Sequence, residues 1–273
     1  MIITGLVTDI LADFNPLEPV APVPLFTFSI GGLQILVSNH MFMVTVAAVL
    51  LLIGIPLIMK SRKMSPAGYL QNLMESICVY LRDEVAKPIM GKHTDQYVGF
   101  VWTVFFFVLT LNLLGMIPSE KIVTLITGRQ NHFGGPATAN IWITGALAAI
   151  TFFMTHITGI REQGLWQYIV SFAPPVPWWL IPMIYFLEIV GSFVKPFVLA
   201  IRLFANMIAG HMVLATFLAL IIILKNYWPV AVPGAMVFAV FQSFLELFVA
   251  FLQAFIFTFL SALYVGSSIV PEH

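Results

Sequence analysis

Charged residues are scarce in this chain of 273 residues. Asp, Glu, Lys and Arg together make up 9% of it, whereas they make up about a quarter of a typical soluble domain. Twelve basic and twelve acidic residues cancel, so no excess of positive charge suggests binding to nucleic acid. Hydrophobic residues make up 60% of the chain. This composition excludes a soluble globular domain and indicates a protein that crosses a membrane several times.

The chain has a single cysteine and lacks one common nucleotide-binding motif. The single cysteine, Cys78, excludes an internal disulfide bond and a metal site built from cysteines. The sequence contains no GxxxxGK[ST] motif, so we expect no ATP site of that type. We expect no bound cofactor or metal ion. The apolar runs lack the alternation of polar and apolar residues that marks the strands of a membrane barrel, so helices are expected.

Five apolar stretches predict five membrane-spanning helices, because about 20 residues cross a ~30 Å hydrocarbon layer. They are residues 37–59, 97–117, 139–160, 180–224 and 233–270. The last two would be roughly 68 and 57 Å long as straight helices, nearly twice the thickness of the bilayer. We therefore predict an all-α polytopic membrane protein in which residues 180–270 form a strongly tilted helical hairpin. A tight turn is expected at 226–233 and a kink near Pro196.

Two further segments flank the first span. Residues 1–36 contain no basic residue and so lack the charged region of a secretory signal, and we expect them to remain in the mature protein. Residues 60–96 mix charged and apolar residues, which is typical of an amphipathic helix on the membrane surface or against a partner helix. The apolar positions recur every four residues, at Leu73, Ile77, Leu81 and Val85. Most basic loop residues then lie on one side, which places 1–36 outside and 60–96 inside.

Arg202 is expected to be costly to place in a membrane, because this charged residue lies near the middle of the apolar run 180–224. A guanidinium keeps its charge in proteins, and inserting one at the bilayer centre costs roughly 2.5–3.5 kcal/mol. Snorkelling to the interface is the alternative, but a side chain of about 6 Å cannot reach water from this position. We therefore expect a group that opposes the charge of Arg202.

The polar residues near Arg202 fall on different faces and at different depths. On an ideal helix Asn206 and Glu188 lie within ~40° of Arg202, whereas His211 points to the opposite face, ~13 Å further along the axis. The predicted topology places His211 towards the outer turn and Glu188 towards the inner end. The titratable groups thus divide into an outer and an inner cluster with a fixed positive charge between them. This is the layout of two proton-access routes that do not meet.

The last apolar stretch carries three polar residues on one face. Gln242, Glu246 and Gln253 lie within ~40° of each other, and Glu246 is about 10 Å nearer the outer turn than Gln253. A carboxylate in a membrane span is a functional candidate by default. Each of these residues, like His211, also has a structural alternative, in which its side chain hydrogen-bonds to a neighbouring helix.

Three motifs resemble subunit a of F-type ATP synthases, the family of proton-channel subunits of the Fo sector. They are KPFVLAIRLFANMIAGH around Arg202, with Glu188 fourteen positions before the arginine, LEL followed by LQAFIFTFLSALY, and NLLGMIP at the end of the second span. The similarity covers residues 97 to 264, so we expect residues 97–273 to form an a-type channel domain. Before residue 97 the chain matches this family in hydropathy alone.

The resemblance implies a role for each candidate residue. Arg202 would face a ring of rotor c subunits, each with a carboxylate in mid-membrane, and Gln253 would lie beside Arg202. His211 and Glu246 would line an outer aqueous half-channel, and Glu188 an inner one. Protons passing between these half-channels and the rotor would drive rotation and ATP synthesis, while the nucleotide chemistry belongs to partner subunits.

The resemblance also implies partners, a location and the surroundings of two further positions. The expected partners are the c-ring, the b subunits of the peripheral stalk, other ATP synthase subunits and membrane lipid. The expected location is the bacterial inner (plasma) membrane, with the mitochondrial inner membrane as the alternative. Asn206 would face the rotor or form a helix-packing contact. Gly115 departs from the family, which often has an acidic residue there.

Two other classes of membrane protein carry charged residues within their spans. An ion-coupled secondary transporter with an Arg/Glu/His relay is the alternative function. Such a protein is expected to show an internal repeat with a broken helix in each half, which this sequence lacks. A voltage sensor needs a basic residue at every third position of a span, and Arg202 has no such neighbours.

Overall fold

A computed structural model of the chain describes residues 23–30, 33–59, 68–117, 134–171, 177–223 and 228–269. The chain divides into two compact units. The first unit comprises residues 1–45, 111–140 and 203–252, and the second comprises residues 46–110, 141–202 and 253–273. The candidate residues therefore fall into two groups, one in each unit.

Helices dominate the described residues, as predicted. The α-helices are α2 (Asn39–Ile58), α3 (Tyr69–Tyr80), α4 (Lys87–Met90), α5 (Thr94–Met116), α7 (Ile141–Gln163), α8 (Leu165–Ser171), α9 (Ile181–Ile223) and α10 (Trp228–Ile269). Five helical stretches of the described chain are long and apolar enough to cross a membrane: Asn39–Ile58, Tyr69–Met116, Ile141–Gln163, Ile181–Phe217 and Val232–Ile269. The predicted all-α polytopic fold class is confirmed.

A small β-hairpin precedes the first span and was not predicted. Strands β1 (Pro24–Ile30) and β2 (Leu33–Ser38) pair antiparallel, with Pro24 opposite Ser38. The hairpin is closed by Asn39, whose backbone N–H donates to the Val23 carbonyl at 3.0 Å and whose Oδ1 accepts from the Val23 N–H at 3.1 Å. Because β2 occupies the chain up to residue 38, α2 begins two residues later than the span predicted at 37–59.

The segment predicted as one amphipathic helix is interrupted in the structure. Between α3 and α4 the chain forms a short π-helix, Leu81–Ala86, and Gly91 has a φ of 54° at the end of α4. A positive φ costs glycine little, and here it separates α4 from α5. Of the predicted apolar stripe, Leu81 and Val85 are buried whereas Leu73 is exposed. The stripe is therefore only partly covered by the chain itself.

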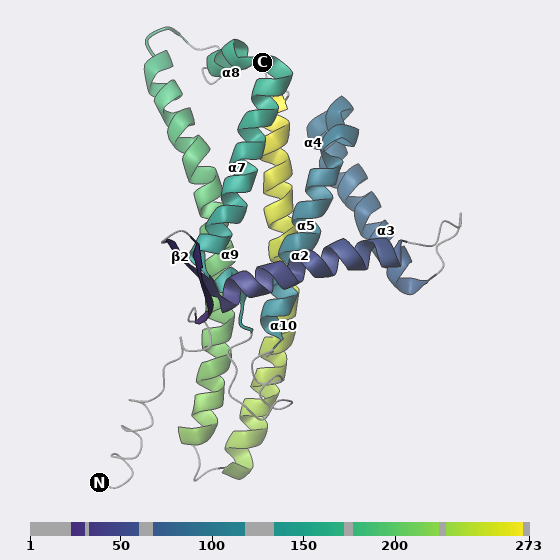
Figure 1. Cartoon of the computed structure of the whole chain (residues 1–273), viewed down its shortest axis with the longest axis vertical. Helices are drawn as coiled ribbons and strands as arrows, with labels where there is room; N and C mark the ends of the chain where they lie inside the picture. Colours follow the sequence, from purple (N-terminus) through teal and green to yellow (C-terminus); the bar gives the residue numbers. More distant parts are fainter. Residues whose placement is uncertain are drawn as a thin grey trace. The chain divides into compact units, whose positions relative to one another are not determined.

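Helices α9 and α10 each run as one long element, α9 with Pro196 inside it (Figure 1). The turn predicted at 226–233 is too long, because α10 already begins at Trp228. Pro229 is tolerated in the first helical turn, where backbone N–H groups lack helical partners in any case. Residues 224–227, which complete the connection, lie outside the described residues.

In the second unit, small and hydroxylated residues line the buried face of α7. Thr144, Thr151 and Thr158 are buried and recur at intervals of seven, which places them on one side of the helix. The Oγ1 of Thr151 lies 3.2 Å from the Oγ of Ser261 on α10. A hydrogen bond between hydroxyls lets two membrane helices approach closely, so this contact helps to join α7 to α10.

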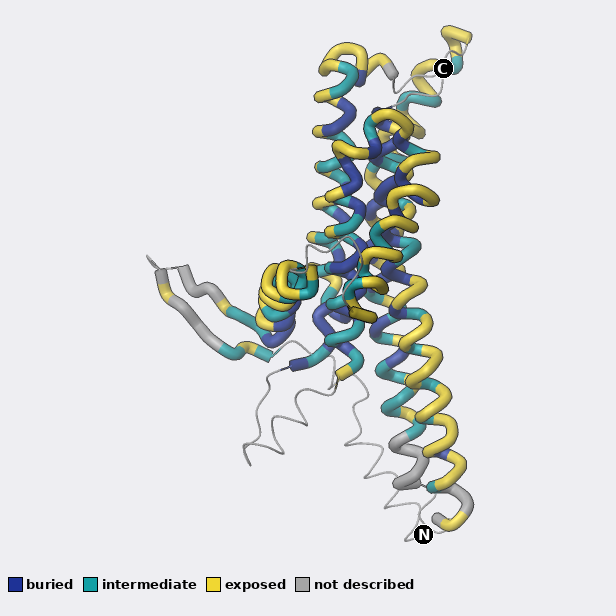
Figure 2. Tube along the Cα trace, turned by 90° about the vertical axis from the view of Figure 1, so that its right-hand side faces the viewer, coloured by how far each residue is buried: buried dark blue, intermediate teal, exposed yellow. Residues whose placement is uncertain are grey.

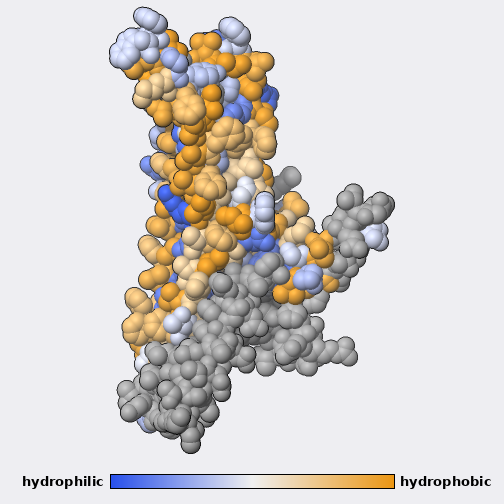
Figure 3. All heavy atoms as spheres, turned by 90° about the vertical axis from the view of Figure 1, so that its left-hand side faces the viewer, coloured by the Kyte–Doolittle hydropathy of each residue, from blue (hydrophilic) through white to orange (hydrophobic). Residues whose placement is uncertain are grey.

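The outer surface of the helices is apolar. Exposed residues run in long stretches along them (Figure 2), and hydrophobic residues dominate the coloured part of the face shown in Figure 3. Exposed aromatic side chains include Phe186, Phe193 and Phe197 on α9 and Phe241, Phe244 and Phe248 on α10. Such a surface requires lipid or partner helices as its surroundings.

Candidate functional site

Arg202 lies on the exposed side of α9, within the second unit. Leu199 and Leu203, on either side of it in the sequence, are buried, whereas Arg202 itself is exposed. Ala205 and Ala209, which follow on the same side of the helix, are also exposed. Among the described residues Arg202 has no ion-pair partner within 4.0 Å. Its charge therefore faces outward from an apolar, membrane-spanning helix.

Two groups on α10 belong to the same unit as Arg202. The phenol of Tyr264 interacts electrostatically with the charge of Arg202. Gln253 is only 3% exposed, and its Nε2 has no hydrogen-bond partner among the described residues. A hydrogen bond from Gln253 to a neighbouring helix was the structural alternative for this residue, and the amide nitrogen makes none here. The predicted position of Gln253 beside Arg202 stays a prediction.

His211 and Glu246 are brought together in the first unit. The Nε2 of His211, on α9, lies 3.9 Å from the Oε1 of Glu246, on α10, and their side chains are only 16% and 11% exposed. This separation is too long for a hydrogen bond, and neither atom has another hydrogen-bond partner among the described residues. Buried polar atoms are nearly always hydrogen-bonded, so the pair is suited to a bridging water. Gly210 makes room, since a Cβ there would lie 3.0 Å from Oε1.

Gly115, at the end of α5, lies in the most crowded part of the same unit. A Cβ at this position would clash with the Cε of Met207 and lie 3.2 Å from the Cα of Pro136. The imidazole of His211 is also within hydrogen-bonding reach of the Gly115 backbone. The absence of a side chain at Gly115 therefore allows α5 to pack closely beside the His211 helix.

Two further polar residues of the first unit are buried. The Nδ2 of Asn112, on α5, donates to the Ala250 carbonyl on α10 at 3.3 Å, which fits a helix-packing role. His40 is fully buried at the start of α2, and its Nδ1 lies 3.0 Å from the Pro136 carbonyl. The sequence analysis missed His40, because a histidine at the first turn of a span gives no periodic signal. Asn206 is half-buried in this unit.

Glu188 forms an ion pair on α9. Its Oε1 lies 3.1 Å from the Nζ of Lys195, and the two side chains are 47% and 45% exposed. The seven-residue spacing places both on one face of the helix. Lys195 is therefore the ion-pair partner of Glu188 among the described residues. An exposed pair of this kind contributes about 0–1 kcal/mol in water.

A second polar group lies near Glu188 and was not predicted. The Nδ1 of His156, on α7, lies 2.8 Å from the Phe152 carbonyl, and its Nε2 lies 3.0 Å from the Oγ of Ser192, on α9. Tyr168, on α8, packs edge-on against the His156 ring at 6.0 Å. Burial raises the pKa of Tyr168, and the negative charge of Glu188 raises it further. Its phenol therefore stays protonated near neutral pH.

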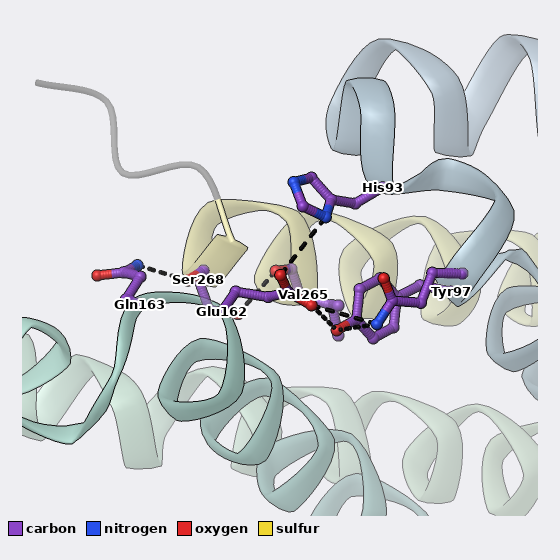
Figure 4. Close-up of polar contacts among 7 residues, drawn as sticks. His93, Tyr97, Glu162, Gln163, Val265 and Ser268 are labelled. Carbon is purple, nitrogen blue, oxygen red and sulfur yellow. Dashed lines mark hydrogen bonds and ion pairs between the residues drawn. The ribbon is translucent and has the colours of Figure 1, made fainter.

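A third polar cluster joins the ends of α5, α7 and α10 (Figure 4). Glu162 accepts hydrogen bonds from the Tyr97 hydroxyl at 2.7 Å and from the Gln96 amide at 3.2 Å, and His93 lies 3.6 Å away. The side-chain amide of Gln163 donates to the Ser268 carbonyl at 2.6 Å (Figure 4). The sequence analysis passed over Glu162 because it follows the predicted end of a span. The described residues contain no group of three or more His, Cys, Asp or Glu residues that could hold a metal ion.

Comparison with known proteins identifies the family. The sequence model of the ATP synthase A chain family matches residues 41–266. The chain belongs to this family. The resemblance inferred from the motifs around Arg202 is thereby confirmed, and the match extends further towards the N-terminus than those motifs do.

Members of the family from several bacteria are similar over most of their length. ATP synthase subunit a 2 of Prosthecochloris aestuarii is 38% identical over 261 residues, which cover 93% of this chain and 75% of that protein. ATP synthase subunit a of Myxococcus xanthus is 40% identical over 247 residues, or 89% and 76% of the two chains. The corresponding protein of Chlorobium phaeobacteroides strain BS1 is 38% identical, covering 94% and 73%. Family membership supports a role in the Fo proton channel and does not favour the alternative of a secondary transporter.

Proposed function

We propose that the chain is the membrane stator subunit of an F-type ATP synthase and passes protons between two half-channels and the carboxylates of a c-subunit ring. The observation that carries this proposal is the outward-facing guanidinium of Arg202 on a spanning helix. A permanent charge exposed to lipid is costly, and no described residue neutralises it. A partner that presents a carboxylate at the same depth removes this cost.

The charge of Arg202 then controls when a rotor carboxylate is ionised. An ionised carboxylate in hydrocarbon costs several kcal/mol, so the rotor site crosses the lipid only when protonated. Near Arg202 the ionised form is favoured, and the proton leaves. Once past Arg202, the site takes up a proton from the other half-channel before it re-enters lipid. Arginine suits this role because lysine can lose its own proton when buried.

The polar residues of the two units supply the half-channels. In the order of the sequence along α9, Arg202 lies between Glu188 and His211. His211 and Glu246 line the outer half-channel, where the unpartnered atoms of the pair accommodate water. Glu188 lines the inner half-channel. Gln253 offers its unpaired amide near the rotor carboxylate.

The apolar exterior supports the remaining assignments. The small exposed residues Ala205 and Ala209 continue the face of Arg202, so this side of α9 faces the c-ring, and Asn206 borders that contact. Other exposed apolar faces serve the b subunits of the peripheral stalk and lipid. The bacterial origin of the similar proteins supports a bacterial inner membrane as the location.

Substitution of Arg202 tests the proposal. In inverted membrane vesicles that contain the complete ATP synthase, Arg202→Ala is expected to abolish ATP-driven proton pumping, because the ionisation of rotor carboxylates is no longer favoured. Arg202→Lys is expected to retain little pumping. Val198→Ala is the matched control, since Val198 is exposed on the same helix. Coupled pumping by Arg202→Ala at the level of the control would overturn the proposed function.

A further inference from the structure

Two side chains at the start of α2 are hydrogen-bonded to the segment that connects α5 to α7. The Nδ2 of Asn39 donates to the Gly134 carbonyl at 2.9 Å, and the Nδ1 of His40 lies 3.0 Å from the Pro136 carbonyl. Asn39 is 5% exposed and His40 is fully buried. They belong to the first unit, as do residues 134–139, which we call the connecting turn. None of the roles assigned above uses His40.

The hydrogen bond of His40 has a defined direction. A carbonyl oxygen can only accept a hydrogen bond, so the Nδ1 of His40 carries the hydrogen and donates to the Pro136 carbonyl. The same carbonyl also accepts from the Ala139 backbone N–H at 3.0 Å. Both lone pairs of this oxygen are therefore used, one within the connecting turn and one by His40. The position of the turn is thus tied to the start of α2.

The connecting turn packs against α5 and α9. The Cα of Pro136 lies 3.2 Å from the position that a Cβ at Gly115 would take, and the Cε of Met207 is closer still. Ala139 and Met207 are both buried and belong to one hydrophobic cluster. Because close-packed groups transmit a displacement to their neighbours, a shift of the turn would be felt at Gly115 and along α9.

His211 adjoins the same contacts. It follows Met207 by four residues on α9, which places the two side chains on one face, one helical turn apart. Its imidazole is also within hydrogen-bonding reach of the Gly115 backbone, and its Nε2 lies 3.9 Å from the Oε1 of Glu246. His40 is therefore linked to His211 by a continuous series of contacts that runs over the connecting turn and Gly115.

These groups also lie on the same side of the membrane in the predicted topology. The start of α2, the end of α5 and the connecting turn are expected at the outer side, and His211 is displaced from Arg202 in that direction. His40 is thus on the same side as the pair assigned to the outer half-channel.

We propose that His40 is a positioning residue for His211 in the outer half-channel. This inference rests on the proposed function, because it concerns the half-channel that His211 and Glu246 are assigned to line. The hydrogen bond from His40 holds the connecting turn against Gly115, and this packing keeps His211 at the distance from Glu246 that suits one bridging water. His40 acts through the turn and transfers no proton itself.

A general role in folding is the competing explanation, since the same hydrogen bond also joins two segments of the chain. Two polar substitutions test whether this particular hydrogen bond matters. In His40→Asn the amide nitrogen lies the same number of bonds from Cα as Nδ1 of histidine, so it can still donate to the Pro136 carbonyl. In His40→Gln the amide nitrogen lies one bond further away and no longer matches this position.

The experiment measures ATP-driven proton pumping in inverted vesicles that contain the complete ATP synthase, with each rate divided by the amount of assembled complex on immunoblots. His40→Gln is expected to lower pumping by about five- to tenfold, as for the loss of one hydrogen bond. His40→Asn is expected to stay within about twofold of the unaltered protein, because the bond is kept. Thr45→Val is the matched control on α2 and should pump normally, because the Thr45 hydroxyl is exposed and bonds to the Met41 carbonyl of its own helix.

A second measurement asks whether the effect passes through His211. His211→Gln keeps a hydrogen-bonding group at that position and is expected to retain part of the pumping. If His40 acts by positioning His211, adding His40→Gln to this variant should lower pumping by less than about twofold, because the positioned imidazole is already gone. A general loss of structure would instead lower pumping by the same factor as in the unaltered chain.

Two results would overturn the positioning role. One is equal pumping by His40→Asn and His40→Gln, whether both are normal or both are impaired. The other is an equal loss from His40→Gln in the unaltered chain and in the His211→Gln chain. Arg202→Ala, measured in the same series, tests the proposed function separately. If it abolishes pumping while the two His40 variants pump equally, only the positioning role is refuted.

Discussion

Exchanging His211 and Glu246 is the sharpest test of the proposed outer half-channel. The double variant His211→Glu/Glu246→His keeps one acid and one base at the same two positions, on α9 and α10. Each single variant, His211→Ala or Glu246→Ala, leaves the other member of a nearly buried pair without its partner. We expect the exchange to be tolerated better than either single loss.

The geometry sets the size of the effect. In the state in which His211 is protonated and Glu246 is ionised, the two unit charges 3.9 Å apart interact by about 4 kcal/mol at an effective dielectric constant of ~20. Each ~1.4 kcal/mol is a factor of ten, so the full interaction corresponds to about a thousandfold. Water that enters the half-channel screens part of it, and we expect each single variant to lower pumping about ten- to hundredfold. The exchange should recover to within about threefold of the unaltered protein.

ATP-driven acidification of inverted vesicles measures these rates, and immunoblots for the other subunits verify assembly. Ser243→Ala is the control on α10, because the Ser243 hydroxyl is exposed and bonds only to the Ala239 carbonyl of its own helix. If the exchange is as impaired as the worse single variant, the two residues do not serve one pathway. Near-normal pumping by both single variants would show that the pair is not needed.

Two further variants probe the packing around the site. Gly115→Ala should lower assembly of the complex, because there is no space for a Cβ at this position. Gly99→Ala is the control and should assemble normally, because nothing lies within 4 Å of the added Cβ. Equal amounts of assembled complex on immunoblots would contradict this prediction. Tyr97→Phe removes a 2.7 Å hydrogen bond to Glu162 and should lower the melting temperature of the detergent-solubilised chain by a few degrees. Tyr69→Phe is the control, because Tyr69 is 98% exposed, and its melting temperature should not change. A Tyr97→Phe melting curve that coincides with that of the control would show that the hydrogen bond contributes nothing.

The main features of the fold could be predicted because they depend on composition along one segment at a time. A run of apolar residues long enough to span the bilayer specifies a helix whatever lies beside it, which is why five spans were predicted and found. The hairpin before α2 was missed, because strand pairing is a contact between two segments, and the composition of one segment does not show it. The start of α10 was placed too late, because the expected turn extended to Pro233, whereas the helix begins at Trp228 and contains Pro233.

In the candidate site, too, some residues could be predicted from the sequence and some contacts could not. Arg202 could be found from sequence because a lone charge in an apolar run needs no further context. The partnership of His211 with Glu246 followed from helix faces and depth within a hairpin, and the structure places them 3.9 Å apart. The contact of His156 with Ser192 could not be predicted in this way. Periodicity gives the direction of a side chain on its own helix but does not say which other helix lies there.

The bare side of α9 around Ala205 and Ala209 bears on how a rotating partner can be held. Side chains that interdigitate, as in a coiled coil, lock two helices in one register and resist sliding. Methyl groups protrude too little to lock in this way, so in the proposed contact the successive subunits of a rotating c-ring can slide past this surface. Resistance to rotation at this contact would then come mainly from the electrostatic attraction between Arg202 and an ionised rotor carboxylate. Protonation of that carboxylate removes the attraction.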